Sequence, residues 1–197
     1  MLRLFKLTPL FILITILAHG QDNVKNYYHI PEVLTFDSLQ YKLIASYHPN
    51  DVYYKQEYVP AGEIADHFNK MIFIDFVVTE LTVKDMVERK VDELNERKKS
   101  DPVVNYEVME NTAKSEYILD FILSSNQGNK LDIVERNIYR YKTYTDKAGH
   151  TGVLLFGVSQ RGYGIGITAF FAKLKASRMG DINKASAYTI PGVEIDR

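Results

Sequence analysis

The sequence contains no cysteine among its 197 residues. This absence excludes disulfide bonds, thiolate metal sites, a cysteine nucleophile and a lipid-modified cysteine behind a leader. Tryptophan is also absent, and no Asn-x-Ser/Thr glycosylation acceptor occurs. A domain of this size can form a core without disulfides. These absences therefore favour a bacterial periplasmic or secreted protein over a eukaryotic one.

The sequence also lacks an excess of positive or negative charge. The chain has 24 Lys and Arg against 25 Asp and Glu, a net charge of −1. Removing the first twenty residues takes away Arg3 and Lys6 and leaves 22 against 25, a net charge of −3. Such a balance provides neither the basic surface that nucleic acid requires nor a basic tract for anionic lipid. We therefore expect no nucleic-acid partner.

Long apolar runs are confined to the N-terminus. Arg3 and Lys6 precede the apolar stretch 7–17, and small residues follow at Ala18 and Gly20. The stretch has about 11 residues, whereas a membrane-spanning helix needs about 20. This order predicts a signal peptide over residues 1–20, cleaved after Gly20, and export to the periplasm or the exterior. An uncleaved anchor is the alternative, and we expect no membrane span after cleavage.

The remaining chain is long enough for one domain with a hydrophobic core. Residues 21–40 lack a clean period and are interpreted as a loosely held lead-in, and 41–197 as a single domain. Residues 52–58 alternate and predict a half-buried strand. Residues 71–79 predict a second strand, apolar on both parities except at Asp75.

A helix signal follows the second strand. Thr82 is the expected N-cap, and Asp85 three residues later completes a capping box. Asp101 and Pro102 close the element. The apolar positions repeat at helical spacing and are Val83, Met86, Val87, Val91 and Leu94.

Four more strands are predicted after this helix, with short connections between them. Short connections between consecutive strands favour antiparallel pairing. The expected turns contain Gly128 and residues 147–150. The strands are 105–110, 116–124, 132–144 and 151–159.

The period changes again after Gly166. Ile167, Phe170, Phe171 and Leu174 lie at helical spacing, so a second amphipathic helix is expected to about Arg178. Gly180 is the expected stop, because glycine commonly ends helices. A short helical turn over 181–188 and an extended segment 190–195 complete the chain.

Antiparallel strands with two amphipathic helices predict an α+β fold in which the helices pack on the sheet. The order of elements over residues 41–195 resembles the Mog1/PsbP-like α+β sandwich. The phrase Tyr58–Glu63 (YVPAGE), leading into MIFIDF, resembles segments of uncharacterised exported bacterial proteins. The first resemblance implies a binding or assembly-accessory role and transfers no catalytic residue.

The segment 164–169 matches the pattern G-x-G-x-x-A between a strand and a helix. Dinucleotide-binding turns have this pattern, but they begin a parallel βαβ unit with an acidic residue about 20 positions later. Too little chain follows here, so a close helix–sheet turn is the favoured interpretation. An anion site at Arg161, Gly164 and Gly166 is the intermediate possibility.

Asp75 and Asp120 each lie inside an apolar strand, in the segments FIDFVV and ILDFIL. A buried carboxylate needs a partner or a raised pKa. Arg136 and Arg140 share one parity of the strand 132–144 and could meet Asp120. The favoured interpretation is that both Asp residues lie on the solvated side of the sheet and form cross-strand ion pairs. The rival is an enzyme of unrecognised type, of the hydrolase class, and it requires all four side chains to converge in one pocket.

The four histidines beyond the leader, at positions 29, 48, 67 and 150, are scattered, and none has a metal-ligand spacing. No nucleophile elbow, P-loop or zincin motif is present. We therefore expect no metal, no cofactor and no assigned catalytic residue.

Fourteen tyrosines are present, and Tyr139 and Tyr141 share one strand face. Tyrosine suits a recognition surface because it combines apolar area with a polar tip, and it suits strands equally. The leading hypothesis is a non-catalytic exported module that binds a protein or a small ligand. Its candidate ligand-binding residues are Asp75, Asp120, Arg136, Arg140, Tyr139 and Tyr141.

Overall fold

The computed structural model describes residues 24–128 and 130–195, so the predicted signal peptide lies outside the described residues. The strands are β1 (Val33–Phe36), β2 (Leu39–Asn50), β3 (Tyr53–Pro60), β4 (Lys70–Val78), β5 (Asn105–Asn111), β6 (Glu116–Gln127), β7 (Lys130–Thr145) and β8 (Thr151–Tyr163). The helices are α1 (Val83–Lys98) and α2 (Ile167–Ala187), with a short 3₁₀ turn η1 (Gly164–Gly166) before α2.

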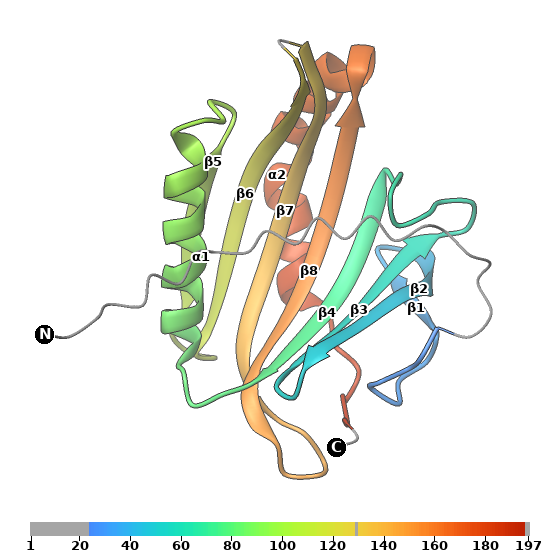
Figure 1. Ribbon diagram of the computed structural model, residues 1–197, viewed down its shortest axis with the longest axis vertical. Coiled ribbons are helices and arrows are strands. Elements are labelled where there is room, and N and C mark those ends of the chain that lie inside the picture. Colours follow the sequence, from blue (N-terminus) through green and yellow to red (C-terminus); the bar gives the residue numbers. More distant parts are fainter. Residues whose placement is uncertain (1–23, 129, 196–197) are drawn as a thin grey trace, which may run out of the picture.

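The strands form one sheet in the order β1-β2-β3-β4-β8-β7-β6-β5 (Figure 1). Every neighbouring pair is antiparallel, which the short connections predict for the consecutive strands β5 to β8. The sheet consists of two four-stranded meanders that meet where β4 pairs with β8. Helix α1 connects the two meanders, and α2 follows the second one.

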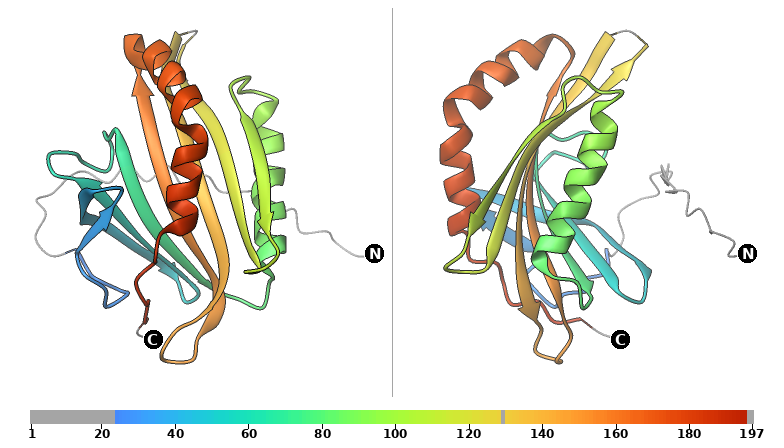
Figure 2. Two further views of the ribbon diagram at one scale, coloured as in Figure 1. Left: turned by 180° about the vertical axis from the view of Figure 1, so that it is seen from behind. Right: turned by 90° about the vertical axis from the view of Figure 1, so that its left-hand side faces the viewer.

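The predicted fold class, an α+β sandwich, is wrong because the molecule has much more sheet than helix. The sheet dominates the molecule, and its two helices lie on opposite faces instead of packing together as a helical layer of an α+β sandwich (Figure 2). The sequence pattern identified β3 to β8 and both helices but not β1 and β2. It also could not say which face each helix would cover. The resemblance to the Mog1/PsbP-like sandwich therefore does not hold.

Each face of the sheet has its own hydrophobic core, because strand side chains alternate between faces. On the α2 face, Ile72, Ile74 and Phe76 of β4 are fully buried. On the α1 face, Met71 and Phe73 of the same strand belong to a second core with residues of α1. This explains why β4 is apolar on both parities, as strands buried on both faces are.

Helix α1 begins as the sequence predicts. The Thr82 hydroxyl accepts a hydrogen bond from the Asp85 backbone N–H at 3.1 Å, and the Asp85 carboxylate accepts one from the Thr82 backbone N–H at 2.8 Å. These two bonds satisfy amide groups that a helix start leaves unpaired. Val83, Val87 and Leu94 are the buried positions of the helix.

Helix α2 differs from its prediction in length and in burial. It continues through Gly180 to Ala187, so Gly180 is not a stop. A glycine inside a helix costs only about 1 kcal/mol, which tertiary contacts of the second half can outweigh. Ile182 and Ala185 in that half are buried, whereas Phe171 of the predicted apolar stripe is 38% exposed.

The N-terminal lead-in is held firmly from its first described residues. Tyr28 is completely buried, and its hydroxyl donates to the Ile74 carbonyl at 3.0 Å. Its backbone N–H donates to Gln56 Oε1, also at 3.0 Å. The prediction of a loosely held segment is therefore wrong for this part. Among the described residues, no helix is long and apolar enough to cross a membrane.

Candidate functional site

The four residues of the enzyme hypothesis do not converge. Asp75 pairs with Leu155 in the sheet register, and Leu155 pairs with Tyr141, so Asp75 and Tyr141 share the α1 face. Asp120 lies in register with Ile138, whose side chain belongs to the core on the α2 face. The two carboxylates therefore lie on opposite faces of the sheet, and the required common pocket does not form.

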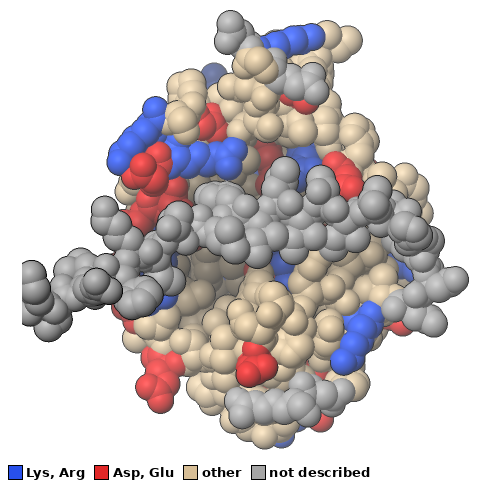
Figure 3. All heavy atoms as spheres, viewed as in Figure 1, with Lys and Arg blue, Asp and Glu red and all other residues tan. Residues whose placement is uncertain are grey.

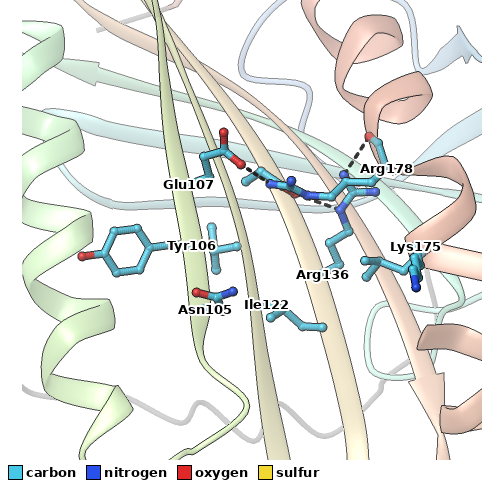
Figure 4. Close-up of a pocket in the computed structure, with 10 residues that line it drawn as sticks. Asn105, Tyr106, Glu107, Ile122, Arg136, Lys175 and Arg178 are labelled. Atoms are coloured by element: carbon cyan, nitrogen blue, oxygen red, sulfur yellow. Dashed lines mark hydrogen bonds and ion pairs between the residues drawn. The ribbon is translucent and has the colours of Figure 1, made fainter. Parts of the chain in front are cut away.

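On the α2 face, Asp120 meets Arg136 as the hairpin predicts. Arg136 Nε donates to Asp120 Oδ1 at 2.8 Å, and both side chains are at most 5% exposed. Arg178 of α2 donates to the other carboxylate oxygen at 2.6 Å and also pairs with Glu107 of β5 (Figure 4). Asp120 thus has a guanidinium on each oxygen.

Arg136 uses its remaining donors to hold α2. Its Nη1 donates to Asp181 at 2.9 Å, and its Nη2 donates to the Arg178 carbonyl at 3.1 Å. Figure 4 shows Arg136 of β7 and Arg178 of α2 pointing toward one another beside Glu107. A cavity of about 370 Å³ adjoins this network, but these arginine donors are already engaged by protein oxygens.

Arg140 does not reach Asp120. It pairs with Glu116 through two hydrogen bonds, from Nε at 3.0 Å and from Nη2 at 2.9 Å. Its Nη1 donates to the Tyr188 carbonyl just beyond the end of α2, at 2.7 Å. A cation at a helix C-terminus satisfies free carbonyls and interacts favourably with the helix dipole. Arg136 and Arg140 therefore both connect α2 to the sheet. The expected ion pair of Asp120 is present, but the side chain is buried and does not lie on a solvated side of the sheet.

The α1 face contains a different kind of site. A cavity of about 640 Å³ lies between α1 and the strands β3, β4, β7 and β8. Asp75, Tyr139 and Tyr141 all line it, so it unites three of the predicted ligand-binding residues. Figure 3 shows this face, where acidic and basic side chains lie side by side at the upper left.

Asp75 is the central polar group of this cavity. The Tyr53 hydroxyl donates to Asp75 Oδ2 at 3.0 Å. The other oxygen, Oδ1, is buried and accepts no hydrogen bond from any residue that the structure describes. Burial raises the pKa of Asp75 to about 6, even though Lys55 and the Tyr53 hydroxyl act to lower it. A buried acceptor without a donor is costly, and a perturbed carboxyl in a cavity indicates a functional site.

Lys55 stands beside Asp75, its partner in the register of β3 and β4. Burial acts to lower the pKa of Lys55, but the carboxylates of Asp75 and Glu57 outweigh burial and raise it. Lys55 forms its ion pair with Glu57, at 2.9 Å. Its ammonium therefore remains charged and is directed mainly to Glu57, while Asp75 Oδ1 stays without a donor.

Aromatic rings cross the sheet next to this polar group. The ring of Phe73 contacts Tyr139 edge-on, with centroids 5.2 Å apart, and Tyr139 contacts Phe121 in the same way at 4.8 Å. Phe73 and Tyr139 are on β4 and β7, separated by β8. Gly157 of β8 makes this contact possible, because a Cβ atom there would lie 2.0 Å from the Phe73 ring.

The residues of the anion and nucleotide hypotheses are placed elsewhere. β8 is antiparallel to both of its neighbours, so the parallel unit of a dinucleotide site does not exist. Arg161 pairs with Glu135, and its guanidinium lies 3.9 Å from the centroid of the Phe68 ring. Gly164 and Gly166 form the 3₁₀ turn η1 before α2.

Several residues of the cavity were not identified from the sequence. Tyr53 and Lys55 lie on the polar parity of the predicted strand 52–58, a pattern typical of a solvent-facing side. Their position beside Asp75 depends on the register of β3 and β4, which are separated by a nine-residue connection. Other unforeseen residues come from α1 and are Met86, Arg89, Lys90 and Glu93.

The chain thus has an eight-stranded antiparallel sheet with a cavity between one helix and the sheet. A family model matches residues 28–190, and the family is uncharacterised. Because the match covers more than half of the sequence, the chain belongs to this family. No curated protein and no solved structure matches the chain.

Proposed function

We propose that this protein is an exported binding protein whose ligand occupies the cavity between α1 and the sheet. The observation that carries the proposal is Asp75 Oδ1, a buried acceptor in a cavity of about 640 Å³ with no donor among the described residues. Pockets for small molecules have volumes of about 300–1,000 Å³ and combine apolar walls with few polar groups.

The cavity walls indicate the chemistry of the ligand. Asp75 would accept a hydrogen bond from a hydroxyl or an amine. The surrounding walls are mostly apolar and aromatic, from Val77, Val153, Leu155, Tyr139 and Tyr141, among others. The ligand is therefore a small molecule with an apolar body and one hydrogen-bond donor. Export, inferred from the leader, would place this binding in the periplasm or the exterior.

Titrations with three matched probes test the proposal. We would measure binding of n-hexylamine, n-hexanol and hexanoate to the protein at pH 8 by NMR chemical-shift changes. The amine should bind most tightly, because a charge-assisted hydrogen bond to Asp75 adds to burial of the chain. Asp75→Asn should weaken amine binding at least tenfold, about 1.4 kcal/mol.

Asp92→Asn is the matched control, because Asp92 is an exposed carboxylate on α1 outside the cavity. It should leave amine binding within about twofold, since a distant exposed carboxylate is largely screened. Binding of hexanoate as tight as that of the amine, or no effect of Asp75→Asn, would contradict the proposal. Failure of all three probes to shift resonances of the cavity would contradict it as well.

A further inference from the structure

A second cavity, of about 730 Å³, adjoins the first along α1. It is lined by the C-terminal half of α1, the following loop and the end of β6, with Leu94 and Leu123 as its apolar residues. Lys90 and Glu93 line both cavities, so the two cavities have these side chains in common. Together they extend along α1 from Met86 to Arg97, about 17 Å at the helical rise per residue.

The side chains between the two cavities, Lys90 and Glu93, are held only by a weak ion pair. Lys90 Nζ pairs with Glu93 at 2.8 Å, and the Glu93 side chain is 67% exposed. Exposed ion pairs contribute at most about 1 kcal/mol, so a ligand can displace this pair at little cost. Below the pair, Lys90 Nζ lies 5.8 Å from the centroid of the Phe121 ring, which continues the aromatic row from Tyr139.

The charged side chains that line the two cavities differ in how fully they are paired. Lys55 is paired with Glu57, and Lys90 is paired with Glu93. Asp75 has a hydroxyl on one oxygen and no donor among the described residues on the other. The groove thus has near one end a buried carboxylate oxygen without a hydrogen-bond donor among the described residues. In its second cavity the apolar side chains of Leu94 and Leu123 lie among polar residues. A linear molecule with a donating head and an apolar tail matches this order of groups.

We infer that the two cavities form one groove for a single-chain amphiphile, with its amine or hydroxyl head at Asp75 and its tail passing beneath Lys90 and Glu93 to Leu94 and Leu123. This inference rests on the proposed function and adds the length and shape of the ligand. A flexible chain can pass the boundary between the cavities, whereas a wide rigid ligand would fill only the first.

A chain-length series tests the inference. The affinities of n-hexylamine, n-octylamine, n-decylamine and n-dodecylamine would be measured below their micelle concentrations by isothermal titration calorimetry. Each methylene that enters an apolar site should increase affinity about fourfold. We expect the increase to continue through the longer amines in the unmodified protein.

Two substitutions block the second cavity in different ways. Leu123→Trp fills it from β6, and Ser100→Trp fills it from an exposed position just beyond α1. Both should leave hexylamine binding within about twofold and abolish the gain from the longer amines, because the tail loses its apolar site. Asp92→Trp, on α1 outside both cavities, should keep the full gain and controls for nonspecific adsorption.

The outcomes separate this inference from the proposed function. If affinity stops rising at the same chain length in the unmodified protein and in both blocked variants, the second cavity is not used. The inference is then wrong, while hexylamine binding that depends on Asp75 leaves the proposed function standing. If hexylamine does not bind, both fail. Equal loss of the gain in Asp92→Trp would also overturn the inference.

Discussion

Asp75 and Asp120 occupy similar positions in the sequence, each inside an apolar strand, yet the fold gives them opposite surroundings. Asp120 accepts hydrogen bonds from Arg136 and Arg178, one on each oxygen. Asp75 accepts one from Tyr53 and has a buried oxygen without a donor among the described residues. A buried, fully paired carboxylate joins elements together, whereas a buried carboxylate with spare acceptor capacity is available to a ligand.

The same contrast extends to the faces on which they lie. On the α2 face, Arg136 and Arg140 of β7 donate to carboxylates and to carbonyls within α2 and just beyond its end. On the α1 face, the helix leaves a cavity above β3, β4, β7 and β8. The comparison indicates that charge on the α2 face stabilises the fold, and it supports our proposal that charge on the α1 face serves binding.

The largest expected effect is on the α2 face. Arg136→Met removes a guanidinium that is only 2% exposed and leaves Asp120 and Asp181 without one of their cations. Removing one partner of a buried ion pair costs about 3–5 kcal/mol. The free energy of unfolding, measured by urea denaturation, should fall by this amount.

Arg89→Met is the control, because Arg89 is an exposed arginine of α1. Its stability should stay within about 0.5 kcal/mol of the unmodified protein. A loss of less than 1 kcal/mol for Arg136→Met would show that the α2 face does not depend on its buried ion pairs.

A smaller effect is expected beneath the cavity. Gly157→Ala places a Cβ atom against the Phe73 ring and displaces it from Tyr139. Overpacking of this kind costs about 1–3 kcal/mol. Thermal denaturation should show the loss, and the NMR resonances of Tyr139 should shift.

Gly180→Ala is expected to increase stability, whereas Gly157→Ala is expected to decrease it. Gly180 lies inside α2 with no atom within 4 Å of a Cβ position, so alanine should stabilise the helix by up to about 1 kcal/mol. If both glycine substitutions stabilise the protein, the close approach of Phe73 to β8 is not required.

The smallest effect concerns the start of α1, the helix that covers the cavity. Thr82→Ala removes the capping hydroxyl that accepts from Asp85 and should cost about 1 kcal/mol. Thr168→Ala, at an exposed position in the first turn of α2, should change stability by less than about 0.5 kcal/mol. Equal effects in urea denaturation would indicate that the two helix starts are equally dependent on side-chain capping.

Local signals in the sequence predicted most elements. The alternation of β3, the capping box of α1 and the antiparallel meander after α1 are all confirmed, because each depends on residues close together in the chain. The end of α2 was wrong, since glycine is a weak signal compared with the contacts of Arg136 and Arg140. Periodicity also does not determine on which face of a sheet a helix packs.

The candidate site could be predicted only in part. The Asp120–Arg136 pair follows from one hairpin and is confirmed. The cavity requires β4 to pair with β8, eighty positions further along the chain at Asp75 and Leu155. No local pattern determines such a long-range register, so Asp75 could not be separated from Asp120 or joined to Tyr53 and Tyr141.

The most direct test compares two isosteric substitutions, Asp75→Asn and Asp120→Asn. Burial raises the pKa of Asp75 to about 6, so its ionisation destabilises the folded state above pH 6. The unmodified protein should therefore gain stability relative to Asp75→Asn as the pH falls from about 7 to about 4, by up to about 3 kcal/mol. At pH 8, Asp75→Asn should be the more stable protein.

Asp120→Asn should behave in the opposite way at pH 8, because it leaves two guanidinium groups without their carboxylate. We expect a loss of about 3 kcal/mol in the free energy of unfolding, measured by urea denaturation. Opposite signs for the two substitutions would support a structural α2 face and a binding site on the α1 face. A similar loss for both would contradict this division.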